Sequence, residues 1–173
     1  AQDVSAYIVF KFSSGAWNSI DTIYGFQNTS FLDTNSSSFA NNIVQYSIVA
    51  MDSCSSGTPP QNNTSSAGLE HQNILLNYQY DKCLSQVGLN WNHYINFKNS
   101  LKEYEIYFKN DSLPWTLLHS TSDTNYSYAI QEGNLNYQFF IKAIFNSSNL
   151  TSFSNILSFY ANQPPVPEYS YIS

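Results

Sequence analysis

The sequence predicts an all-β protein, for three reasons. Short runs of aromatic and β-branched residues recur between breaks rich in Ser, Asn and Gly, as in strands joined by turns. No segment keeps the i, i+3, i+4, i+7 apolar spacing of a helix, and Ala, Leu and Glu, which favour helices, are scarce. We therefore expect almost no helix. In chain order, the expected strands cover residues 7–12, 43–50, 89–91, 104–108 and 137–145.

Composition excludes several classes of function. Hydrophobic residues make up 42% of the 173 residues, which is enough for a core, whereas charged residues make up only 10%. All six basic residues are Lys, and the formal net charge is −6. Without Arg, an acidic chain is a poor partner for nucleic acid or for an acidic membrane surface. No apolar run approaches the length of a membrane span, and the first residues do not resemble a signal peptide.

Two copies of one unit of about 95 residues are present. Residues 6–11 with Trp17 resemble residues 103–109 with Trp115, at an offset of 97 residues. Two further matches, at offsets of 93 and 95 residues, join residues 44–50 to 137–143 and residues 29–31 to 124–126. A unit of this length with about seven short strands has the size of an immunoglobulin-like β-sandwich.

The two copies define the expected domains. We expect the first repeat over residues 1–78 and the second over residues 79–163. Residues 53–68 are rich in Ser, Asn, Pro and Gly and are expected to form a long loop. Residues 164–173 begin with Pro-Pro-Val-Pro and read as a stiff linker followed by a candidate first strand of a further repeat.

The second repeat resembles a fibronectin type III domain. Leu89-Asn90-Trp91 looks like its B strand and residues 104–107 like its C strand, and residues 130–137 are similar to its E–F turn and corner tyrosine. The resemblance implies tandem fibronectin type III or immunoglobulin-like sandwiches. It also implies a second core that contains Leu89, Trp91, Tyr104, Ile106, Tyr137, Phe139, Ile141 and Ala143.

The first repeat and the junction carry a second resemblance. It rests on Asp3-Val4, residues 7–11, 15–17, 20–25 and 46–54, His71, residues 74–76, Cys83 and residues 89–91. These are similar to the fibronectin-like arrays of large Bacteroidota surface proteins that carry a gliding-motility-associated C-terminal domain and are exported by the type IX secretion system. The resemblance implies an extracellular protein, attached to the outer membrane or secreted. Its implied partners are flanking repeats of the same polypeptide, a surface or secretion-system protein, or a glycan.

The same resemblance suggests two modification sites. Asp21-Thr22-Ile23 and Asp111-Ser112-Leu113 resemble the acceptor pattern of O-glycosylation in that phylum. Thr22 and Ser112 are therefore candidate O-glycosylation sites.

The first repeat is expected to be incomplete. In the second repeat, Trp91 of the B-like strand precedes Tyr104 by 13 residues, so the residue that matches Trp91 would lie upstream of Ala1. We expect the first repeat to lack its first strands and to be completed by upstream residues or by a partner protein.

The two cysteines suggest a disulfide at the domain junction. Cys54 follows the F-like strand of the first repeat, and Cys83 precedes the B-like strand of the second. A bond between them would close a loop of about 29 residues and stabilise the fold by about 3.5 kcal/mol in the chain-entropy model. The alternative is a pair of free thiols. Only His71 lies between them as a further soft ligand, so no metal site is expected.

No constellation of residues predicts catalysis or a cofactor. The histidines, His71, His93 and His119, lie in no nucleophile motif, and they read as surface or turn residues. Glu103 and Glu105 lie two apart on one strand face at roughly 7 Å, a spacing that an inverting glycosidase could use. Both are expected to project into water, however, with no apolar pocket to keep one of them protonated. We therefore expect no enzyme activity.

Two tryptophans are candidate aromatic contacts. Trp17 and Trp115 occupy equivalent places after the C-like strand, which favours a repeated packing role over a ligand platform. The sequence thus predicts a non-catalytic structural or adhesive segment of a bacterial cell-surface repeat protein, related to gliding motility or adhesion. The alternative is an accessory carbohydrate-binding module of a secreted polysaccharide-degrading enzyme, in which Trp17 and Trp115 would stack on sugar rings.

Overall fold

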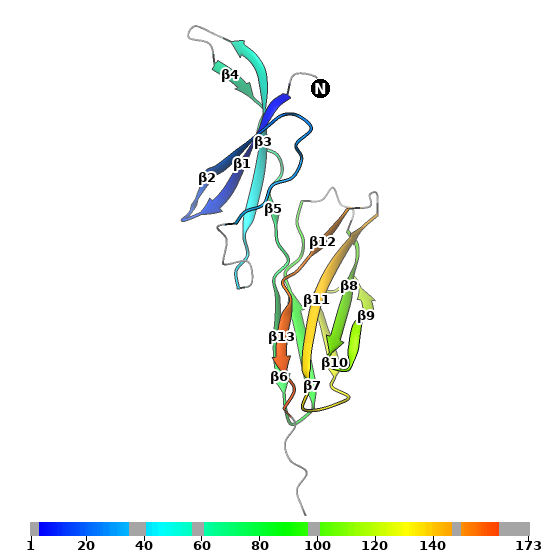
Figure 1. Ribbon diagram of the computed structural model, residues 1–173. Coiled ribbons are helices and arrows are strands. Elements are labelled where there is room, and N and C mark those ends of the chain that lie inside the picture. The colour runs from blue at the N-terminus through cyan, green and yellow to red at the C-terminus, as the bar shows by residue number, and fades with distance from the viewer. Residues whose placement is uncertain (1–3, 35–40, 57–60, 97–100, 147–149, 163–173) are drawn as a thin grey trace, which may run out of the picture. The chain divides into compact units, whose positions relative to one another are not determined.

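A computed structural model describes residues 4–34, 41–56, 61–96, 101–146 and 150–162 (Figure 1). These residues form strands, turns and coil without a helix, which confirms the all-β prediction. Among them there is no helix long and apolar enough to cross a membrane. The contacts divide the chain into unit 1, Ala1–Asn73 with Tyr94–Asn99, and unit 2, Ile74–His93 with Ser100–Ser173. Residues 164–173, the predicted linker, lie outside the described residues.

Unit 1 contains one antiparallel sheet with the order β2-β1-β3-β4, in which β5 also pairs with β3. Its strands are β1 (Val4–Ser13), β2 (Ala16–Tyr24), β3 (Gln45–Ser56), β4 (Gln61–Thr64) and β5 (His71–Gln72). The β1–β2 hairpin turns at Ser14 and Gly15, whose φ angles of 54° and 80° fit the two-residue turn that matches the twist of paired strands. Glycine allows the second of these angles without strain.

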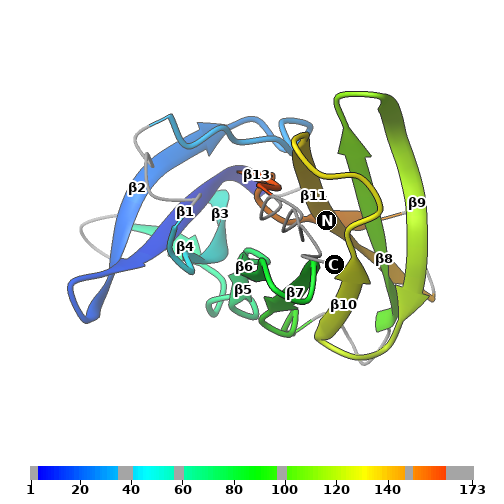
Figure 2. The same cartoon turned by 90° about the horizontal axis from the view of Figure 1, so that it is seen from below.

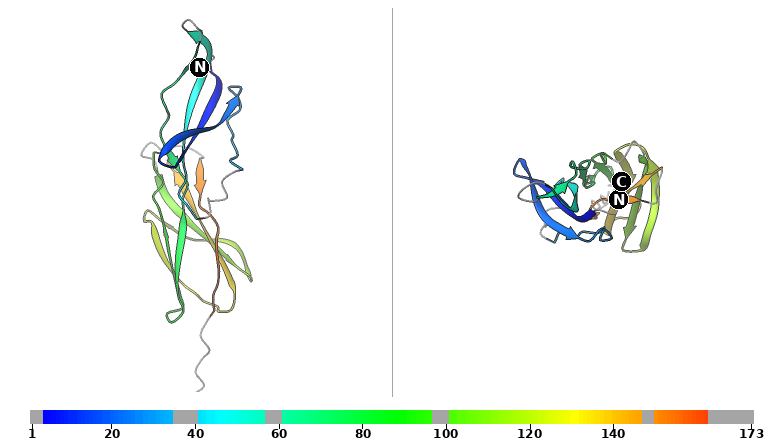
Figure 3. Two further views of the ribbon diagram at one scale, coloured as in Figure 1. Left: turned by 90° about the vertical axis from the view of Figure 1, so that its left-hand side faces the viewer. Right: turned by 90° about the horizontal axis from the view of Figure 1, so that it is seen from above.

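Unit 2 is a sandwich of two antiparallel sheets, with the orders β10-β7-β6 and β12-β11-β8-β9, and β13 also pairs with β11 (Figure 2). Both sheets can be followed from two further sides in Figure 3. Its strands are β6 (Leu76–Asp81), β7 (Gln86–Trp91), β8 (Leu101–Asn110), β9 (Leu113–Thr121), β10 (Asn125–Ala129), β11 (Asn136–Phe145), β12 (Thr151–Phe153) and β13 (Leu157–Tyr160). The predicted limit of the first repeat, residue 78, falls inside β6.

The core of unit 2 contains the residues that the sequence predicts. β8 and β11 alternate between buried and partly exposed residues, as strands with one face on a core do. All eight predicted core residues are at most 5% exposed: Leu89, Trp91, Tyr104, Ile106, Tyr137, Phe139, Ile141 and Ala143.

The expected tyrosine corner is also present. The buried Tyr137 hydroxyl donates a hydrogen bond of 2.9 Å to the Glu132 carbonyl, five residues upstream. This bond ties the turn before β11 to the strand itself.

All five predicted strands are present, although the second begins at Gln45 rather than residue 43. The predicted loop over residues 53–68 is wrong at residues 53–56 and 61–64, which are strand, whereas residues 65–68 are coil. β3 continues to Ser56, and β4 pairs with it antiparallel, with Ser56 opposite Gln61. Polar Ser and Asn side chains are compatible with a strand here because backbone hydrogen bonds, rather than apolar burial, hold a hairpin at a sheet edge.

The two units share one register between their central strands. Tyr7 lies opposite Ala50 in unit 1, as Tyr104 lies opposite Ala143 in unit 2. The next inward pairs are Val9 with Ile48 and Ile106 with Ile141. β1 and β3 are therefore the structural counterparts of β8 and β11, at the offsets of 97 and 93 residues that the sequence repeat indicates.

Candidate interaction surface

One face of the unit 1 sheet is hollowed by a cavity of about 580 Å³. We call this the inner face, because its residues correspond to the core-facing residues of β8 and β11. Apolar and aromatic side chains from three neighbouring strands line it, namely Tyr7, Val9, Ile23, Tyr46 and Ile48. Residues 28–33, in the connection between β2 and β3, form the rest of the cavity wall.

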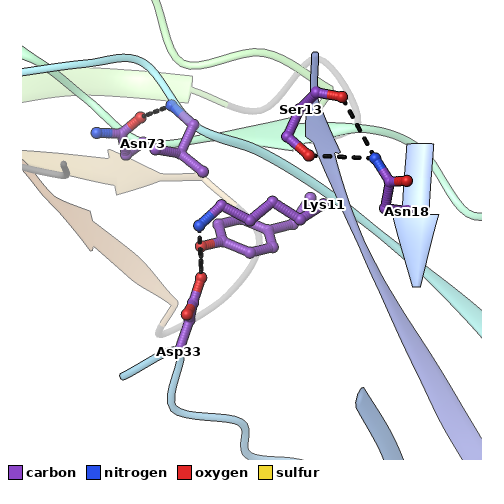
Figure 4. A network of polar contacts seen from close by, with 7 residues as sticks. Lys11, Ser13, Asn18, Asp33 and Asn73 are labelled. Carbon is purple, nitrogen blue, oxygen red and sulfur yellow. Dashed lines mark hydrogen bonds and ion pairs between the residues drawn. The ribbon is translucent and has the colours of Figure 1, made fainter. Parts of the chain in front are cut away.

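An ion pair fastens residues 28–33 to the sheet. Lys11 Nζ lies 2.8 Å from Asp33 Oδ2, and the Tyr46 hydroxyl donates a hydrogen bond of 2.7 Å to the same oxygen (Figure 4). Only 18% of the Lys11 side chain and 9% of the Asp33 side chain are exposed. Pairs this well shielded from water are screened less than surface pairs, so the contact holds the coil in place.

This ion pair occupies the place of an aromatic pair in unit 2. Lys11 is the counterpart of Phe108 at the offset of 97 residues, and Asp33 is the counterpart of Tyr128 at the offset of 95. The rings of Phe108 and Tyr128 lie 5.4 Å apart, and they join β8 to β10. Residues 29–33 therefore contact the sheet of unit 1 as β10 contacts the sheet of unit 2.

Residues 29–33 nevertheless do not form a strand. In unit 2, β10 pairs antiparallel with β7, and Tyr126 lies opposite Leu89. Among the described residues of unit 1, nothing pairs with residues 29–32, and their backbone amides and carbonyls make no hydrogen bond. The described part of unit 1 contains no counterpart of β7. The incomplete first repeat stays a prediction.

One apolar position of the repeat is much more exposed to solvent in unit 1 than in unit 2. Ile48 is 52% exposed, whereas its counterpart Ile141 is fully buried. Phe31 and Leu32, on the coil beside the cavity, are 37% and 80% exposed. Exposed apolar residues gathered around one cavity are typical of an interaction surface.

The outward face of the larger unit 2 sheet carries a row of aromatic side chains. Tyr107 stacks on Phe140 at 4.9 Å, and Trp115 and Phe153 contact the same Phe140 ring at 4.7 and 6.0 Å. Lys109 Nζ lies 5.2 Å from the centre of the Trp115 ring. The row is thus packed within itself, with Trp115 36% exposed at its edge.

A polar cluster of Glu105, Lys142 and Tyr107 lies beside this aromatic row. It shows that the expectation of a freely solvated Glu105 is wrong. Glu105 does not project freely into water: its Oε2 lies 3.1 Å from Lys142 Nζ and accepts a hydrogen bond of 3.0 Å from the Tyr107 hydroxyl. Burial and this hydrogen bond raise the pKa of Tyr107. Glu103 pairs instead with Lys102 at 2.8 Å, so the two glutamates have separate partners rather than one shared substrate position.

The tryptophans lie where the repeat indicates. Trp17 and Trp115 are on the equivalent strands β2 and β9, and Trp17 packs edge-on against Phe12 at 5.4 Å. Both therefore contact aromatic neighbours on their own sheets. This agrees with the packing role that the sequence favours.

The predicted disulfide is not formed at Cys83, which is a free and exposed cysteine. Cys83 lies in the turn between β6 and β7, where its backbone N–H and that of Leu84 donate to Asp81 Oδ1 at 2.8 and 3.0 Å. The Asp81 side chain closes this turn, so the turn needs no cross-link. The Cys54 side chain lies outside the described residues.

The remaining candidate residues are spread over the chain. His71 Nδ1 lies 3.2 Å from the Tyr94 hydroxyl, and His119 stacks on Tyr126 at 4.9 Å. Thr22 is half-buried on β2, and Ser112 is exposed in the turn between β8 and β9. Their glycosylation remains a prediction. Within the described ranges, no group of three His, Cys, Asp or Glu residues could hold a metal ion.

The sequence analysis missed Lys11 and Asp33. A signal for them exists in the repeat, because two positions that are aromatic in one copy carry opposite charges in the other. Such a paired exchange indicates that the two side chains are in contact.

The order of strands in unit 2, with β10-β7-β6 facing β12-β11-β8-β9, together with the tyrosine corner, decides the fold. The fold is fibronectin type III-like. No protein-family profile and no curated protein sequence matches the chain.

Solved structures with a similar fold include two chicken proteins. A crystal structure of the CNTN1 FN1–FN3 domains matches 93% of this chain at 13% identity with a TM-score of 0.43, and the chain spans 56% of that structure. A segment of two fibronectin type III domains from tenascin matches 90% of this chain at 14% identity with a TM-score of 0.36, and 83% of that segment is covered.

Proposed function

We propose that this chain is a non-catalytic structural or adhesive segment of an extracellular bacterial repeat protein. The observation that carries the proposal is the shared register of β1–β3 and β8–β11, because it makes the two units copies of one fibronectin type III-like module. Tandem modules of this kind are suited to spacing or adhesion, since each sandwich is held by its own strand ladders and core.

The location of the protein forms the second part of the proposal. The resemblance of residues 7–11, 20–25 and 46–54 to Bacteroidota surface arrays supports export by the type IX secretion system and a role in adhesion or gliding motility. The absence of Arg and the net charge of −6 disfavour nucleic acid as a partner.

Surface labelling tests this proposal. An antibody raised against residues 1–173 should bind intact cells that make the protein, and brief protease treatment of these cells should remove the signal. Inactivating type IX secretion should abolish surface labelling, while a periplasmic marker stays protected in every arm. Labelling that requires permeabilised cells would contradict an extracellular location.

A second candidate function is glycan binding, which the exposure of Trp115 and Phe153 on one sheet face favours. Lys109 and Phe140 already contact the Trp115 ring, which leaves less of it for a sugar. A glycan array distinguishes the two functions. A carbohydrate-binding module should give signals that Trp115→Ala removes, whereas a spacer should bind none.

A further inference from the structure

The described residues of unit 1 contain counterparts of three strands of unit 2, namely β8, β11 and β10, but no counterpart of the β6–β7 hairpin. The central strands β1 and β3 have the register of β8 and β11. Residues 29–33 are held against them as β10 is held against β8, through Lys11 and Asp33 in place of Phe108 and Tyr128. The cavity of about 580 Å³ lies between these parts.

The missing part has a defined chemistry in unit 2. There, β6 and β7 form an antiparallel hairpin whose inward residues Val87, Leu89 and Trp91 are at most 5% exposed. Leu89 lies opposite Tyr126, the counterpart of Phe31. A strand with alternating apolar residues would therefore meet Phe31 and cover Ile48 if it took the same place in unit 1.

Two kinds of contact favour a strand over other occupants. The backbone of residues 29–32 makes no hydrogen bond to the described residues, so its N–H and C=O groups can pair with those of an added strand. The side chains of Tyr7, Val9 and Ile48 offer an apolar floor beneath that strand. A small apolar molecule would use only the floor, and a helix could not satisfy the backbone of residues 29–32.

We propose that the inner face of unit 1 binds a β-hairpin of the β6–β7 type, which pairs antiparallel with residues 29–33 and packs its alternating apolar residues on Tyr7, Val9 and Ile48. The hairpin is an amphipathic partner segment, and its binding converts the single sheet of unit 1 into a two-layered sandwich. The inference does not depend on the extracellular location proposed above.

A synthetic peptide tests the proposal directly. The probe is residues 76–91 with Cys83→Ser, added to the full chain, and the readout is amide hydrogen exchange resolved by residue. Exchange at residues 29–32 should slow by about tenfold or more when the ladder forms. Exchange in β8, β10 and β11 should not change, because their positions are already occupied.

Matched variants locate the contact. Ile48→Lys, on the inner face, should weaken peptide binding in calorimetry by about tenfold or more, because an ammonium would be buried under the hairpin. Leu69→Lys is the control, since Leu69 is 58% exposed and lies outside the cavity, and it should bind within about twofold of the parent chain. A peptide with Val87→Asp and Leu89→Asp should not bind.

Three results would overturn the proposal. One is the absence of binding by the peptide, and another is protection confined to residues outside 29–33 and the inner face. The third is a dimer of the chain in sedimentation that Ile48→Lys dissociates, since this would make a second copy the occupant. Circular dichroism of each variant checks that the sheet of unit 1 is retained, and the exchange experiment on the parent chain needs no variant.

Discussion

The Tyr137 side chain links the core of unit 2 to the turn before β11. Its ring is fully buried and stacks near Phe139 and Phe159, while its hydroxyl reaches the Glu132 carbonyl. Because the ring is in the core and the bond is at the turn, the turn before β11 cannot shift without disturbing the core.

Removing that hydroxyl should destabilise unit 2. We expect Tyr137→Phe to lower the free energy of unfolding by about 1 kcal/mol, since the hydrogen bonds between the Tyr137 hydroxyl and the Glu132 backbone are lost while the ring is kept. Urea unfolding at 25 °C measures the change. Tyr160→Phe is the control, because Tyr160 is 52% exposed, and it should lie within about 0.5 kcal/mol of the parent. Equal losses in the two variants would contradict the role of the corner.

The Tyr107 hydroxyl predicts a dependence of stability on alkaline pH. Burial and the hydrogen bond to Glu105 raise its pKa above the ordinary value of about 10, so the folded state holds the proton more tightly than the unfolded state. This contribution is complete below about pH 10 and is lost as pH rises through the folded pKa.

We therefore expect the free energy of unfolding to fall less steeply between about pH 9 and 11.5 in Tyr107→Phe than in the parent. The fall should not vanish, because burial also raises the pKa of Tyr80 and Tyr128. Tyr24→Phe, at a 70% exposed position, should follow the parent curve. An unchanged slope in Tyr107→Phe would refute the assignment.

At the scale of elements, the connection between β2 and β3 is positioned by side chains rather than by a ladder. Lys11 of β1 and Tyr46 of β3 both contact Asp33, so two neighbouring strands hold one coil. A segment that is held by side-chain contacts rather than by a strand ladder opens more easily once one of them is lost.

Replacing the lysine should show this. We expect Lys11→Met to destabilise unit 1 by about 1.5–3 kcal/mol, because the shielded Asp33 carboxylate loses its cation. Limited proteolysis should then cut within residues 28–33 faster than in the parent. Lys102→Met is the matched control: the side chains of its pair with Glu103 are 55% and 27% exposed, and its loss should change stability far less than Lys11→Met does. Similar effects of the two variants would argue against the ion pair as the anchor.

At the scale of the whole molecule, the two units differ in the number of sheets that the described residues form. Unit 2 has two sheets around a closed core, whereas the described part of unit 1 has one sheet with Ile48 half-exposed. A single sheet buries less apolar area per residue, and its stability is correspondingly smaller.

We expect unfolding in two steps, with unit 1 first. Amide exchange in increasing urea should release β1 and β3 at lower concentrations than β8 and β11. Adding the hairpin peptide of residues 76–91 should move only the first step upward, because it binds only unit 1. One cooperative transition for both units would contradict this expectation.

The sequence by itself determined the strands, the repeat and the core of unit 2. Period-two alternation and the matches at offsets of 93 and 97 residues are local patterns, so they predict the strands β1, β3, β8 and β11.

Only the tertiary structure decided the contacts between side chains that are distant in sequence. Lys11 meets Asp33 across 22 residues, and Lys142 meets Glu105 across 37, while Cys83 is a free thiol in a turn closed by Asp81. The physical reason is that the alternation of apolar and polar residues along a strand predicts only which face of the sheet each side chain occupies. Which groups meet on that face depends on how strands and coils far apart in the chain pack together.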